Sequence, residues 1–79
     1  MVEEIQERVL SVISEQQGGI EVTPADTLEH LGLDSLDLIE LVMELESSLG
    51  DIVIDDLQVE AWITCQDIIK TCEAIAAKV

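Results

Sequence analysis

The chain has 79 residues, of which 48% are hydrophobic, so it fits one small folded domain and is not a disordered polyanion. Eighteen acidic residues face three basic ones, Arg8, Lys70 and Lys78, which gives a net charge of −15. This charge repels phosphate backbones and anionic lipids, so it argues against nucleic-acid partners and membrane insertion and favours partner proteins with basic patches.

The first predicted element is an amphipathic helix over about residues 2–17. Ile5, Val9, Val12 and Ile13 recur at helical spacing, and the pair of glycines at 18–19 ends the pattern. This stretch has no basic start followed by an apolar block, so no secretory signal is expected and the protein is predicted to be cytoplasmic.

A long connection is predicted between residue 18 and Asp34. Residues 23–26, TPAD, have the spacing of a helix start, which predicts a short helical turn within the connection. Leu28, Leu31 and Leu33 are expected to anchor the connection to the core.

The second helix is predicted to begin at an N-cap, Asp34, and to run to Leu49, with Gly50 closing it. On a helical wheel one apolar stripe faces the core, flanked by Ile39; its members are Leu38, Leu41, Val42, Leu45 and Leu49. The opposite face is acidic and carries two large apolar side chains; its members are Leu36, Asp37, Glu40, Met43, Glu44 and Ser47. This face is predicted to dock basic partners. In the alternative, loop residues cover Leu36 and Met43 and make them part of the core.

A loop over residues 51–54, with Ile52 or Ile54 turned inward, is predicted to lead to a short helix over residues 55–61. Thr64, with Asp67 in capping-box spacing, then predicts a last helix to about Lys78. The fold class is therefore all-α: a small up-and-down-type bundle of three main helices and one short helix, with a long loop between helices one and two.

Two cysteines, Cys65 and Cys72, lie seven residues apart and share one face of the last helix. They are predicted to be buried, reduced thiols of a cytosolic protein. The chain also has one histidine, His30, and a single aromatic residue, Trp62. No nucleophile–base pair or metal-ligand pattern is apparent, so neither a catalytic residue nor a metal site is predicted. The almost wholly aliphatic core is expected to be able to open and admit an apolar chain.

Residues 31–37, LGLDSLD, followed by residues 40–46, ELVMELE, closely resemble the acyl carrier protein family. The family signature is Gly-x-Asp-Ser-Leu at the start of its second helix. The resemblance covers nearly the whole chain, because length, acidity and the order of the helices also agree. It implies that residues 1–79 form a single acyl carrier domain.

The resemblance implies that Ser35 receives 4′-phosphopantetheine from coenzyme A through a phosphopantetheinyl transferase, the holo-carrier synthase. The thiol of this arm would carry acyl groups as thioesters to fatty-acid, lipid or related acyl-processing enzymes with basic docking patches. The implied partner-binding residues are Asp34, Leu36, Asp37, Glu40, Met43 and Glu44. The protein itself would be a monomeric carrier and not an enzyme.

Two alternatives stay open. Residues 62–64, WIT, are similar to D-alanyl carrier proteins, although the signature serine of that group is usually followed by phenylalanine rather than Leu36. The second alternative is an unmodified acidic adaptor that binds partner proteins.

Overall fold

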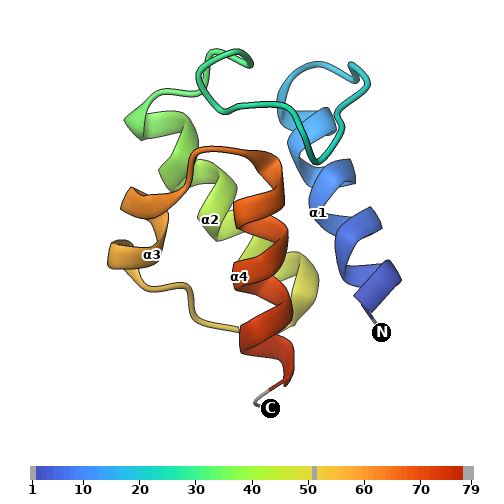
Figure 1. Cartoon of the computed structure of the whole chain (residues 1–79), viewed down its shortest axis with the longest axis vertical. Coiled ribbons are helices and arrows are strands. Elements are labelled where there is room, and N and C mark those ends of the chain that lie inside the picture. Colours follow the sequence, from blue (N-terminus) through green and yellow to red (C-terminus); the bar gives the residue numbers. More distant parts are fainter. Residues whose placement is uncertain (1, 51, 78–79) are drawn as a thin grey trace.

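The computed structural model describes residues 2–50 and 52–77, with side chains described from residue 4 onward. Within these residues the chain forms four helices: α1 (Val2–Gln16), α2 (Ser35–Leu49), α3 (Asp56–Ala61) and α4 (Cys65–Ala77). Figure 1 shows the long connection passing over one end of the bundle between α1 and α2. The predicted all-α class and helix order are confirmed, while Asp51 and Lys78 lie outside the described residues.

The core lies where α1 meets α2 and α4, and α3 packs against α4. Its buried side chains are aliphatic or sulfur-bearing apart from the indole of Trp62; they are Val9, Val12, Ile13, Val22, Leu28, Leu41, Leu45, Ile52, Ile54, Trp62, Cys65, Ile68, Ile69 and Cys72. Burying this apolar surface supplies the main driving force for folding, about 25 cal/mol for each Å² removed from water. The aliphatic core is confirmed, and both Ile52 and Ile54 turn inward.

Residues 23–26 do not form the predicted helical turn. The Asp26 N–H donates to the Thr23 carbonyl at 3.1 Å, and the Asp26 carboxylate accepts from the Thr23 N–H at 2.8 Å. These two hydrogen bonds hold residues 23–26 in a turn. The carbonyls of Pro24 and Asp26 accept from the N–H groups of residues 66 and 65, at 2.9 Å each. The N–H groups in the first turn of α4 have no acceptors within their own helix, and these two carbonyls supply them. The same carbonyls are therefore not available for hydrogen bonds that would continue a helix from residues 23–26. A single turn forms further along, where the Leu31 N–H donates to the Thr27 carbonyl at 3.1 Å.

The start of α4 follows the predicted capping pattern. The Asp67 carboxylate accepts from the N–H groups of Ile63 and Thr64 at 2.9 and 3.0 Å, and Thr64 Oγ1 accepts from the Asp67 N–H at 3.3 Å. The backbone hydrogen bonds from Thr64 and Ile63 lower the pKa of Asp67 below its ordinary 3.8. The connection before α2, the turn after α3 and the start of α4 are thus joined at one end of the bundle.

Of the helices in the described part of the chain, none is both long and apolar enough to cross a bilayer.

Candidate functional site

The first turn of α2 is fixed by a reciprocal capping box. Asp34 Oδ1 accepts from the Asp37 N–H at 2.9 Å, and Asp37 Oδ2 accepts from the Asp34 N–H at 3.2 Å. Gly32, with φ of 74°, turns the chain into this cap, in a conformation that favours glycine. Gln16 at the end of α1 adds a third hydrogen bond to this turn, because its Nε2 donates to the Asp37 carbonyl at 2.8 Å. The predicted N-cap and helix start are confirmed.

Ser35 is the first residue of α2, and its side chain is exposed. Its hydroxyl makes no hydrogen bond to any residue that the structure describes. The hydroxyl lies at the positive end of the α2 dipole, where a phosphate group is stabilised despite the acidic surroundings. An accessible alcohol on a rigid first turn is a suitable attachment point for a phosphodiester.

A groove of about 450 Å³ opens beside Ser35, between the first turns of α2 and the short helix α3. Its lining combines exposed polar groups with apolar side chains, and consists of Ser35, Leu38, Ile39, Asp56, Val59, Glu60 and Trp62. The groove could not be predicted from the sequence, because it depends on where α3, which packs against α4, lies relative to α2. The only sequence signal was Trp62, a lone bulky side chain just before the last helix.

The acidic face of α2 is exposed as predicted. Leu36 and Met43 are 71% and 64% exposed, so the alternative in which loop residues cover them is wrong. Asp34, Glu40 and Glu44 are exposed as well, and Asp37 is half-buried through its capping bonds.

Ile39, placed by the wheel at the flank of the core stripe, is also 57% exposed. The helical wheel placed Ile39 at the edge of the core stripe rather than within it, and the structure leaves most of this side chain open to solvent. Ile39 stands between the groove beside Ser35 and the exposed Leu36 and Met43, so the apolar area on α2 is larger than predicted.

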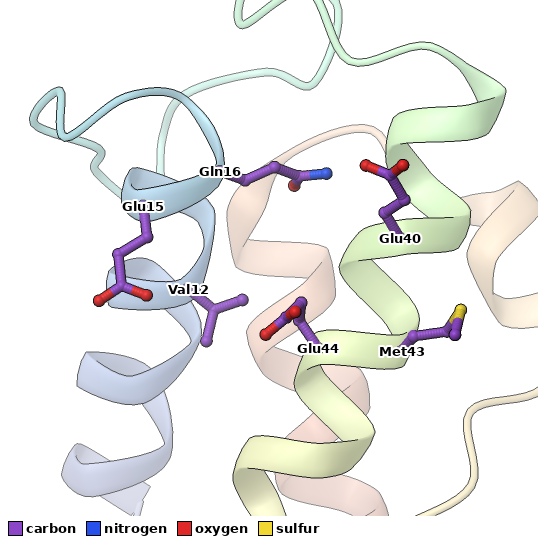
Figure 2. A pocket seen from close by; sticks show the side chains of 6 residues that line it. All are labelled: Val12, Glu15, Gln16, Glu40, Met43 and Glu44. Atoms are coloured by element: carbon purple, nitrogen blue, oxygen red, sulfur yellow. The ribbon is translucent and has the colours of Figure 1, made fainter.

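The carboxylates of Glu40 and Glu44 border a second hollow, of about 360 Å³, between α1 and α2. In Figure 2 the Glu44 carboxylate extends toward α1, whereas the Met43 side chain points away from it. Gln16 forms part of the lining, and its Oε1 is buried without a hydrogen-bond partner among the described residues. Glu15 of α1 also lines this hollow, so acidic residues from both helices border it.

The remaining candidate groups lie apart from this first turn. Cys65 and Cys72 are free and fully buried, and burial raises the pKa of each thiol to about 11. At neutral pH both therefore remain protonated and poorly nucleophilic. His30 is exposed in the connection before α2.

Comparison with known proteins agrees with this geometry. The family described as "Phosphopantetheine attachment site" matches residues 3–72. Proteins with the name acyl carrier protein are similar over most of their length. The one from Thermotoga maritima is 42% identical over 74 residues, which cover 90% of each chain. One from Helicobacter pylori is 41% identical over 70 residues, 85% of this chain and 88% of that protein. One from Prochlorococcus marinus is 41% identical over 75 residues, 91% of this chain and 92% of that protein.

Proposed function

The chain belongs to the acyl carrier proteins, which bear a covalent 4′-phosphopantetheine arm, and we propose that Ser35 is the residue that bears it. Such proteins are carriers rather than enzymes, and they work with a phosphopantetheinyl transferase and with acyl-processing enzymes. The thiol at the end of the arm holds the acyl group as a thioester.

The observation that carries the proposal is the exposed Ser35 hydroxyl at the first residue of α2. The capping box of Asp34 and Asp37 holds the backbone on both sides of Ser35, while the hydroxyl itself stays unbonded among the described residues. In the attachment step an Oγ–phosphorus bond forms, the pyrophosphate bond of coenzyme A breaks, and the nucleotide portion leaves. The transferase takes up the hydroxyl proton.

The test is incubation with coenzyme A and a broad-specificity phosphopantetheinyl transferase, followed by intact-mass measurement. We expect the mass of one arm to be added to the protein and not to Ser35→Ala. Ser47→Ala, which removes an exposed hydroxyl from the same helix, is the matched control and should still gain the arm. An unchanged mass of the wild-type protein would instead support an unmodified acidic adaptor.

We propose that partners dock on the exposed face of α2, made of Asp34, Leu36, Asp37, Glu40, Met43 and Glu44. The support is a pairing of apolar contact area with carboxylates, in a chain whose net charge is −15. The apolar side chains would supply buried area, and the carboxylates would steer a basic partner into register. Ile39 extends the same apolar area toward Ser35.

The cellular setting is also a proposal. We propose that residues 1–79 act as a single acyl carrier domain, monomeric and cytoplasmic, serving fatty-acid, lipid or related acyl-processing enzymes. The two free buried thiols suit a reducing compartment, and a net charge of −15 disfavours self-association. Offering the holo protein to acyl and aminoacyl ligases, and identifying the thioester that forms, tests the cargo and the D-alanyl alternative together.

A further inference from the structure

The residues that line the groove beside Ser35 differ widely in their exposure to solvent. Leu38 and Val59 are half-buried, and Trp62 is only 7% exposed. The other lining residues are exposed: Ser35, Ile39, Asp56 and Glu60. An acyl group on an arm that folds back into the groove would therefore lose contact with water as it moved from the exposed lining residues toward Trp62, the most buried of them.

The Trp62 indole is held in the groove lining by directed bonds. Its Nε1 donates to Thr71 Oγ1 on α4 at 2.9 Å, and that hydroxyl donates to the Asp67 carbonyl at 3.0 Å. The Trp62 backbone N–H donates to the Val59 carbonyl at 3.1 Å, which fixes the residue at the end of α3. Moving the indole would leave a buried donor unpaired, which is unfavourable.

The indole also connects the groove with α4. It lines the groove on one side and bonds to α4 on the other, and Ile68, Ile69 and Cys72 on α4 are completely buried. An aliphatic side chain at position 62 could change rotamer to make room, whereas a hydrogen-bonded indole is a fixed obstacle. The depth of the groove is therefore set by Trp62.

We propose that Trp62 is a specificity-determining end wall that lets the groove shield only the first carbons of a tethered acyl group. The protein therefore carries short acyl groups in a shielded form and leaves the distal part of long chains exposed. This inference rests on the proposed attachment of the arm at Ser35.

The experiment measures the unfolding midpoint Tm of the holo protein loaded in turn with acetyl, butyryl, hexanoyl, octanoyl and dodecanoyl groups. Each newly shielded methylene should raise Tm by up to about 3–6 °C, because burial stabilises by about 0.8 kcal/mol and a domain of this size gains about 4–8 °C per kcal/mol. In the wild-type protein the rise should stop at a short chain. In Trp62→Leu it should continue to longer chains.

Two further variants distinguish a change in the depth of the groove from a general loss of stability. Thr71→Val removes the bond that holds the indole. It should also shift the break, meaning the acyl length at which the Tm rise stops, to longer chains. Leu28→Ala makes a cavity at a buried residue outside the groove lining, so it should lower every Tm and leave the break in place. If Trp62→Leu does not fold, Trp62→Phe, which shortens the ring system, takes its place.

Trp62 is the only tryptophan, so its fluorescence gives a second readout in the wild-type protein. Quenching by acrylamide should fall up to the chain length at which the Tm rise stops, and then stay constant with longer acyl groups. A Tm rise that continues through dodecanoyl in the wild type, a break that is the same in Trp62→Leu, or no dependence on chain length would overturn the inference. Absence of the arm from Ser35, seen by mass before loading, would instead refute the proposed function.

Discussion

Reversing the charge of Glu44 should weaken docking on the α2 face while leaving the fold intact. The carboxylate is exposed, extends toward the hollow between α1 and α2 in Figure 2, and makes no hydrogen bond or ion pair with another described residue. Glu44→Lys therefore removes no contact that supports the helix, and it changes the net charge from −15 to −13. The free energy of unfolding should change by no more than about 0.5 kcal/mol.

The effect on docking should be larger. An exposed ion pair contributes about 0.2–1 kcal/mol, and the reversed charge replaces this attraction by a repulsion of similar size. The total is about 0.4–2 kcal/mol, which raises Kd about 2- to 30-fold. The assay is the kcat/KM with which a phosphopantetheinyl transferase modifies the apo protein, measured together with Tm.

Glu7→Lys is the matched control, because Glu7 is an exposed residue of α1 that lines a different hollow, beside Arg8 and Ser11. It makes the same charge change away from the α2 face and should lower kcat/KM much less. The difference between the two variants should shrink at about 1 M salt, where charges are screened within about 3 Å. Equal losses in Glu7→Lys and Glu44→Lys, or a fall in Tm that parallels the loss of activity, would refute the docking face.

Burial raises the pKa of Cys65 and Cys72 to about 11 from an ordinary 9.0, so their stabilising contribution is complete below pH 9 and disappears as pH rises through 11. Denaturant titrations should show this loss of stability, and thiol reagents should label both residues only at the rate of unfolding. Asp67→Ala removes the acceptor for two N–H groups at the start of α4 and should cost about 0.5–2 kcal/mol. Because the hydrogen bonds from the N–H groups of Thr64 and Ile63 lower the pKa of Asp67, that cost should be complete above pH 3.8 and shrink as pH falls below it. Leu41→Ala, at a fully buried position of α2, should cost about 2–5 kcal/mol in urea unfolding.

The helix boundaries could be predicted because the chain marks them locally. Asp34 caps α2 as predicted, Thr64 and Asp67 form the bonds that their spacing predicts, and Gly50, at φ of 78°, ends α2. The exposed acidic face of α2 could be predicted for a similar reason, since a straight helix places its residues by a fixed angle.

Features that depend on how distant segments meet could not be predicted. Residues 23–26 have the sequence of a helix start, but their carbonyls bind the first turn of α4, a partner some forty residues away. The groove beside Ser35 depends on where α3, which packs against α4, lies relative to α2. The role of the Trp62 indole depends on its bond to Thr71, which sequence spacing does not reveal.

Tandem mass spectrometry on the protein isolated from its own cells would locate the arm most directly. After digestion at glutamates, which separates Ser35 from the other serines, we expect the phosphodiester-linked thiol arm on the peptide that contains Ser35, and on no peptide that contains Ser11, Ser14, Ser47 or Ser48. An arm on any other residue, or a Ser35 peptide that is never modified, would contradict it.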